Sequence, residues 1–345
     1  MQEIFVLNFY YQKFVIHFTP RSNETCEMKD MTFKDSKQIR PKGLKAGDII
    51  GVVSPSSPVN EKLEPRFQAG IRYLEALGFG VRCGEHVRSR SPESDPSAEE
   101  RAADLNDMFR ASEINAIICS QGGDSAEQVL PYLDWDVIRL NPKVLIGISD
   151  ITVLLNAVNR ATGLITFHGN DVVWGWGRHP RSYDLEAFIA RIIKGEVGLI
   201  PPNRERYSIR GGCAEGRLLG GNLRCLLKLR RTPYFPDFTG AILFLEAYHI
   251  TEQECASYLA QLEMEGVFEV INGVVVGYIH SMQTDGRGTS MVEVMLDRLT
   301  TTGGFPILKV NDFGHNCPNT VLPVGGRVRM DAEARSLEIL EKIVS

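Results

Sequence analysis

The chain has 345 residues, of which 43% are hydrophobic, so it is long enough to bury a large core and to form two domains. Its net charge of -5 gives no electrostatic reason to bind nucleic acid or an anionic membrane, and we expect a small substrate. No apolar run approaches the roughly 20 residues that span a bilayer, and the seven cysteines are scattered without a Cys-x-x-Cys pair. These features predict a soluble, cytoplasmic protein with free thiols.

Residues 1–38 differ from the rest of the chain. Their short apolar stretches, residues 4–7 and 14–16, are interrupted by polar and charged residues. Glu3 stands where a signal peptide would carry basic residues, and no small-residue cleavage pattern follows. We therefore predict an extension outside the core, with an export signal as the alternative interpretation.

From residue 48 onward, apolar runs of strand length alternate with segments of helical periodicity. Gly78 follows the first such segment in the position where a left-handed residue ends a helix, and Ser97 precedes the second as its N-cap. This alternation predicts an α/β domain with a parallel sheet, whose ligands bind at the carboxyl ends of the strands. The expected strands are residues 48–55 (ending in a turn signal), 81–83, 116–119, 144–148 and 164–167, and the expected helices are residues 66–77, 98–111, 125–133 and a segment from Asp150.

The sequence changes character after residue 200, where Pro201 and Pro202 precede an arginine-rich polar stretch. We place a domain boundary there, between residues 39–200 and residues 201–345. The mixture of elements beyond it predicts a smaller, sheet-rich second domain. Its expected strands are residues 242–245, 274–279, 321–324 and 327–330, and its expected helices are residues 251–264 and 290–299.

Ser149 lies directly between a predicted buried strand and a predicted helix. A tight turn at such a junction lifts a hydroxyl out of the backbone and surrounds it with N–H groups of the helix start, which can stabilise an oxyanion. The alternative is an ordinary N-cap serine. Residues 147–151 lack the second glycine of the Gly-x-Ser-x-Gly turn, which disfavours an ordinary α/β-hydrolase.

A nucleophilic serine needs a base, and the base needs a partner that fixes its tautomer. His315 lies in a loop-like segment and can face a cleft, or it can be a surface histidine. His168, which follows a predicted strand, is the rival base, and His280 could equally be a packing residue. Glu246 ends an apolar run, where a charge is costly unless it is paired, although it can also mark the solvated end of the strand.

Other chemistry fits the sequence less well. Cys317 lies two residues from His315, but no strand-to-helix turn presents it as a nucleophile, so a structural thiol is expected. No set of His, Cys or carboxylate residues has the spacing of a metal site. The glycine pairs at 122–123 and 220–221 match neither the dinucleotide-binding nor the Walker pattern, so we expect no metal and no nucleotide cofactor.

Several short segments occur together in an order that is known from one family. They are Gly147-Ile148-Ser149-Asp150-Ile151-Thr152, Leu243-Phe244-Leu245-Glu246, Gly314-His315 and Leu322-Pro323-Val324-Gly325, accompanied by residues 121–124, 130–134, 167–169 and 220–223. Through them the chain resembles the LD-carboxypeptidases, including the microcin C self-immunity peptidases, from about residue 40 to about residue 340. The resemblance implies a Rossmann-like N-terminal domain, a barrel-like C-terminal domain and an active site between them.

The resemblance also implies roles for individual residues. Ser149 would attack the carbonyl carbon, His315 would take and return the proton, and Glu246 would steady the imidazolium. Backbone N–H groups near Gly123 and Asp150 would form the oxyanion hole, which the helix start at Asp150 makes physically reasonable. The candidates for substrate binding are Gly122, Asp124, His168, Trp174, Trp176 and Asn222.

Two departures from the family bear on the substrate. The segment after His168 carries Trp174 and Trp176, which could form an aromatic wall for a ring or nucleobase, or could equally belong to the core. Gln121 and Asp124 differ from the family's usual glycine-loop residues, which calls into question the recognition of a murein peptide's terminal carboxylate.

The sequence therefore predicts a cofactor-independent serine peptidase that cleaves an amide next to a free carboxylate, with the L,D bond of a murein tetrapeptide as the first choice of substrate. Hydrolysis of an aminoacyl-nucleotide conjugate is the alternative within the family. A non-catalytic binding protein for a peptide or sugar is the alternative of another class. The family further suggests a homodimer.

Overall fold

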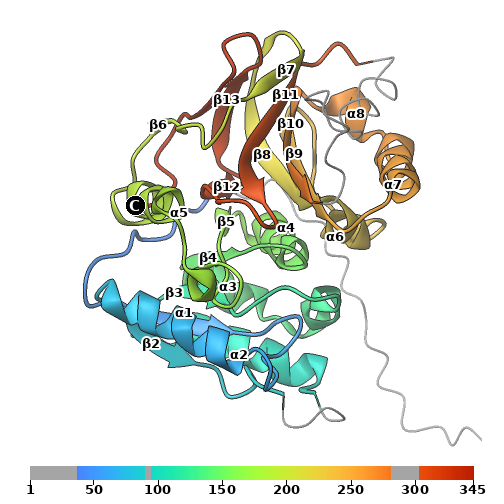
Figure 1. Cartoon of the computed structure of the whole chain (residues 1–345). Coiled ribbons are helices and arrows are strands. Elements are labelled where there is room, and N and C mark those ends of the chain that lie inside the picture. Colours follow the sequence, from blue (N-terminus) through green and yellow to red (C-terminus); the bar gives the residue numbers. More distant parts are fainter. Residues whose placement is uncertain (1–36, 90–94, 281–302) are drawn as a thin grey trace, which may run out of the picture. The chain divides into compact units, whose positions relative to one another are not determined.

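The computed structural model describes residues 37–89, 95–280 and 303–345 (Figure 1). Strands and helices alternate through its first half, as the sequence predicts. The strands are β1 (Ile49–Val53), β2 (Gly80–Cys83), β3 (Ile114–Cys119), β4 (Val144–Gly147) and β5 (Thr166–His168), and the helices are α1 (Glu64–Ala76), α2 (Ala98–Arg110), α3 (Trp135–Leu140), α4 (Ile151–Thr162) and α5 (Ser182–Phe188).

The five strands pair in the order β5-β4-β3-β1-β2, and every neighbouring pair is parallel. The strand order reverses beside β1, because β2 lies on one side of it and β3 on the other. Ligands of open parallel sheets bind outside the carboxyl ends of the strands at such a reversal. The loops that follow β1, β3 and β4 are therefore the expected site.

Local signals mark the helix ends as expected. Ser97 caps α2 through a reciprocal pair of hydrogen bonds with Glu100, and Gly78 adopts a φ of 92° after α1. Residues 125–133 were expected to form an α-helix, but the structure has a 3₁₀ helix at Ala126–Tyr132. It contains Pro131, which lacks the N–H that an α-helical ladder needs.

The second half of the chain builds a larger sheet. Its elements are β6 (Gly198–Leu199), β7 (Tyr207–Arg210), β8 (Cys213–Asn222), α6 (Leu223–Leu226), β9 (Ile242–Tyr248), α7 (Glu252–Met264), α8 (Val267–Val270), β10 (Gly273–His280), β11 (Ile307–Gly314), β13 (Arg327–Asp331) and β14 (Ser336–Ile339). The strand order is β6-β14-β13-β8-β9-β10-β11-β7, with a parallel centre from β8 to β11. The expected helix at 290–299 lies outside the described residues.

One strand from the second half belongs to the first sheet. We expected residues 321–324 in the second domain, but β12 (Leu322–Val324) pairs antiparallel with β5, with Leu322 opposite His168. Helix α4 contacts β4 and β5 of the first sheet and β8 of the second. The predicted class, a parallel α/β sheet with a second sheet-rich part, is confirmed. The boundary near residue 200 stays a prediction, and of the expected extension at 1–38 the structure describes only the last two residues.

Candidate active site

Ser149 lies in the turn between β4 and α4 with a φ of 67°, in the left-handed region that residues other than glycine rarely adopt. Such a conformation costs roughly 1–3 kcal/mol and persists only where the surroundings enforce it, which is common at active sites. The N-cap of α4 is Asp150, and Ser149 precedes it. The alternative of an ordinary N-cap serine is therefore wrong.

The loop after β3 passes close to this serine. A Cβ added at Gly122 would lie 2.6 Å from the Ser149 Cβ, and one added at Gly123 would lie 2.4 Å from Ser56 Oγ. Only glycines allow this close approach of the loop backbone to Ser149 and to the loop after β1. In the described residues, the N–H groups of Gly123 and Asp150 have no hydrogen-bond acceptor, as expected of donors that await an oxyanion.

His315 follows β11 and pairs with Glu246 of β9, with 2.7 Å between Nδ1 and Oε2. The His315 side chain is 16% exposed, so the alternative of a surface histidine is wrong. Glu246 is completely buried because β9 continues to Tyr248, which excludes the solvated strand end that we considered. Asn222 Nδ2 donates to the other carboxylate oxygen at 2.9 Å.

Burial and pairing act in opposite directions on these two groups. Burial raises the pKa of Glu246, but the charge and hydrogen bond of His315 outweigh it and hold the pKa below its ordinary value. Burial also lowers the pKa of His315, but the charge and hydrogen bond of Glu246 oppose this effect, and the His315 pKa is raised above its ordinary value. The carboxylate thus stabilises the imidazolium that forms when His315 takes a proton.

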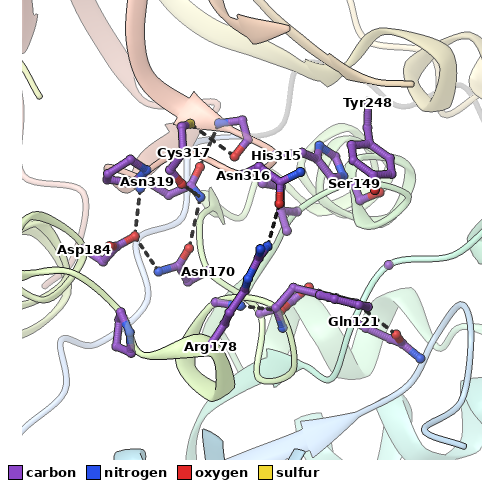
Figure 2. A pocket seen from close by; sticks show the side chains of 18 of the residues that line it. Gln121, Ser149, Asn170, Arg178, Asp184, Tyr248, His315, Asn316, Cys317 and Asn319 are labelled. Atoms are coloured by element: carbon purple, nitrogen blue, oxygen red, sulfur yellow. Dashed lines mark hydrogen bonds between the residues drawn. The ribbon is translucent and has the colours of Figure 1, made fainter. Parts of the chain in front are cut away.

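Ser149 and His315 line one cavity of about 650 Å³, together with Gly122 and Gly123 (Figure 2). Tyr248 stacks on the His315 imidazole with 4.6 Å between the ring centroids. Within the described residues, no hydrogen bond joins Ser149 Oγ to His315. Such contacts are often long without substrate and tighten in the Michaelis complex, so the placement is compatible with nucleophile and base.

His168, the rival base, lies outside this cavity. It is completely buried, packs edge-on against Phe244 and Phe313, and neither ring nitrogen has a partner in the described residues. Burial lowers its pKa to about 4, so it remains neutral at pH 7. His168 is therefore placed for packing rather than for contact with a substrate.

The other expected substrate-binding residues are divided by the structure. Trp174 lines the cavity, whereas Trp176 is buried in the core and stacks on Tyr73. Asn222 contacts Glu246 rather than the cavity, and Asp124 is exposed and pairs with basic side chains. Of the two tryptophans, only Trp174 can form the aromatic wall.

Sequence reasoning missed Arg178, which extends along the cavity and donates to Asn316 Oδ1 at 2.6 Å (Figure 2). Asn316 follows His315 and has a φ of 60°. No pattern in the sequence connects the two residues, which are 138 positions apart. Among the described residues, no group of three or more His, Cys, Asp or Glu side chains is arranged to hold a metal ion, and no helix is long and apolar enough to cross a bilayer.

Comparison with known proteins agrees with this geometry. The model of the LD-carboxypeptidase N-terminal domain matches residues 50–169, and that of the LD-carboxypeptidase C-terminal domain matches residues 215–330. The chain belongs to the LD-carboxypeptidase family. The members of this family are serine peptidases, and the chain contains both of its domains.

Named relatives fall into two groups. A probable murein peptide carboxypeptidase of Bacillus subtilis is 31% identical over 90% of this chain and 97% of its own length. The microcin C7 self-immunity protein MccF of Escherichia coli is 28% identical over 88% of this chain and 96% of its own. A solved structure of MccF with aspartyl sulfamoyl adenosine covers 89% of this chain and 100% of its own, with 26% identity and a TM-score of 0.82.

Proposed function

We propose that this family member is a serine carboxypeptidase that hydrolyses an amide next to a free carboxylate, and that this amide is the L,D bond of a murein tetrapeptide. The observation that carries the proposal is that Ser149, held in a left-handed turn, lines the same cavity as His315, which pairs with the buried Glu246. The names of two relatives, a murein peptide carboxypeptidase and a murein tetrapeptide carboxypeptidase of Pseudomonas aeruginosa, support this choice of substrate.

In the proposed mechanism, Ser149 Oγ attacks the carbonyl carbon while His315 takes its proton through Nε2. The oxyanion accepts hydrogen bonds from the N–H groups of Gly123 and Asp150. His315 then protonates the leaving amine as the C–N bond breaks, which releases D-alanine and leaves an acyl-enzyme. Water, deprotonated by His315, hydrolyses that ester and restores the Ser149 hydroxyl.

Arg178 is the group that we assign to the free carboxylate. It is exposed in the cavity, and its partner there is the neutral amide of Asn316 rather than a carboxylate. Two buried acids also line the cavity, but Asp171 accepts from backbone N–H groups and Asp184 from Asn170 and two backbone N–H groups. A guanidinium that pairs with no carboxylate among the described residues is suited to bind a substrate carboxylate through two parallel hydrogen bonds.

A second candidate function is hydrolysis of an aminoacyl-nucleotide amide. The Trp174 ring is 46% exposed, lines the cavity and has the Arg66 guanidinium 4.4 Å from its centroid on one face. An exposed indole can stack on a nucleobase. Solved structures of MccF contain aspartyl sulfamoyl adenosine and glutamyl sulfamoyl guanosine, which supports this alternative.

The deciding experiment measures D-alanine release from a murein tetrapeptide by mass spectrometry, with the native protein and Ser149→Ala in parallel. Release by the native protein alone is the expected result. Release by both proteins would remove Ser149 from the mechanism. Release by neither would favour the aminoacyl-nucleotide substrate, which is tested next with the native protein and Ser149→Ala. If neither substrate is cleaved but both proteins bind one of them, the protein is a binding module.

Arg178→Met should raise KM for the tetrapeptide about 10- to 100-fold with little change in kcat, since a charge-assisted hydrogen bond contributes about 1.5–3 kcal/mol. The C-terminal amide of the tetrapeptide, which lacks the free carboxylate, should be cleaved equally poorly by the native protein and by Arg178→Met. An unchanged KM would assign the carboxylate to another group.

We also propose a cytoplasmic location and a homodimer. The homodimer is testable by sedimentation.

A further inference from the structure

Lys228 comes from the second half of the chain but reaches the residue that follows the proposed nucleophile. Its Nζ lies 2.7 Å from Asp150 Oδ1, 3.0 Å from Asp124 Oδ1 and 3.1 Å from Glu127 Oε2. The Asp150 side chain is completely buried, whereas that of Asp124 is 65% exposed. Of these three contacts, the one with Asp150 is therefore screened least by solvent.

The Asp150 carboxylate connects the loops that surround Ser149. Its Oδ2 accepts from Ser56 Oγ at 2.6 Å, in the loop after β1, and from the Ala126 N–H at 2.8 Å, in the segment after β3. Burial alone would raise the pKa of Asp150, but the hydrogen bonds from Lys228 and Ser56 hold it below its ordinary value. The carboxylate is thus charged at pH 7.

A buried negative charge at this position has a chemical consequence. The N–H group of Asp150 is one of the two donors proposed for the oxyanion, so the carboxylate and the developing oxyanion share one residue. Without a counter-charge, the carboxylate would repel the oxyanion in a site of low dielectric. Lys228 is the only basic side chain in the described residues that pairs with Asp150.

We infer that Lys228 is a positioning residue for the oxyanion hole. It holds the Asp150 carboxylate, and with it the backbone N–H, in place between the loops after β1 and β3, and it cancels the charge beside the oxyanion. The inference rests on the proposed function of Ser149. It concerns the transition state and not the binding of substrate, so it predicts a loss in kcat and not in KM.

The test uses a fluorophosphonate probe, because its reaction does not depend on which amide is the natural substrate. Ser149 Oγ attacks phosphorus, fluoride leaves, and His315 takes the hydroxyl proton, so the step forms an oxyanion at the same place. The rate of labelling at Ser149 is followed by mass spectrometry for the native protein, Lys228→Met and Lys228→Arg. The matched control is Arg224→Met, which removes another cation that pairs with Asp124 but does not contact Asp150.

We expect Lys228→Met to be labelled about 30-fold more slowly than the native protein. This loss is smaller than the roughly 10²- to 10³-fold loss on removing an oxyanion donor. Lys228→Arg should recover most of the rate, and Arg224→Met should stay within about twofold. Circular dichroism checks the fold. If Lys228→Met does not fold, Lys228→Met/Asp150→Asn removes both charges at once and should be labelled more slowly than the native protein, because it loses the ion pair that holds the Asp150 N–H.

The outcomes separate the two proposals. A native protein that is not labelled at Ser149 would overturn the proposed nucleophile and the inference together. A labelled native protein with an equally fast, folded Lys228→Met would overturn the inference alone. A double variant as fast as the native protein would overturn the positioning role, because neither charge then remains to hold the Asp150 N–H in place. On the substrate that the native protein cleaves, Lys228→Met should lower kcat and leave KM within about twofold.

Discussion

Replacing Glu246 by Gln tests the centre of the proposed mechanism, because it removes one charge and keeps the shape of a completely buried side chain. The carboxylate oxygen lies 2.7 Å from His315 Nδ1. Two unit charges about 4 Å apart interact by about 4 kcal/mol at an effective dielectric constant of about 20. Most of that stabilisation applies only when His315 is protonated in the transition state, so kcat should fall about 10³-fold.

The pH dependence gives a second readout. His315 acts as a base only when it is neutral, so activity rises with pH through the pKa of His315. In the native protein Glu246 raises that pKa against the effect of burial. In Glu246→Gln the lowering of the His315 pKa by burial is opposed only by the smaller effect of the Asp171 charge, so the acid limb of the kcat/KM profile should move to lower pH.

The assay is hydrolysis of the cleaved substrate between about pH 4 and 9, with labelling of Ser149 by the fluorophosphonate as a substrate-independent measure. Glu254→Gln is the matched control, because Glu254 accepts from Thr251 at the start of α7 and does not line the cavity. A folded Glu246→Gln protein with kcat within about threefold of the native value would refute the role of Glu246. An acid limb that does not move would refute the coupling to His315.

Three further variants test other parts of the structure. Gly122→Ala should lower kcat at least about 10²-fold, because its Cβ would lie 2.6 Å from the nucleophile's Cβ, whereas Gly304→Ala, with open space around its Cβ, should not; both are measured in the same assay. Trp174→Ala should weaken binding of an aminoacyl-nucleotide analogue about 10-fold by calorimetry and leave the tetrapeptide unaffected, and equal losses would contradict a nucleobase site. Arg206→Met breaks a pair with Asp312 whose side chains are 3% and 1% exposed, so urea denaturation should show a free energy of unfolding lower by about 3–5 kcal/mol.

The sequence predicted best what depends on neighbouring residues. Ser97 as an N-cap, Gly78 as a helix end and the strand before Ser149 are all local signals, and the structure confirms them. The family segments also led to Glu246 and His315, which the structure places in contact. Each of these residues could be predicted from the few residues around it in the sequence.

What the sequence did not predict depends on contacts between distant segments. Arg178 and Asn316 meet across 138 positions, and Lys228 and Asp150 across 78. Neither pair produces a periodicity or a motif, since an arginine or lysine in a polar segment resembles any surface cation. The burial of Trp176 beside an exposed Trp174 was equally beyond prediction, because two positions in a turn follow no regular period.

The same long-range pairing explains how a base from one half of the chain is held over a nucleophile from the other. The chain runs from His315 directly to β12, where Leu322 pairs with His168 of β5. His168 in turn pairs with Gly147 of β4, two residues before Ser149. Backbone pairs therefore connect the segments that carry nucleophile and base, while β11, which ends directly before His315, lies in the second sheet together with β9 and Glu246. His315 thus lies between β11 of the second sheet and β12, which pairs with the first sheet, so its position relative to Ser149 depends on backbone pairing on both sides, and the carboxylate of Glu246 orients the ring.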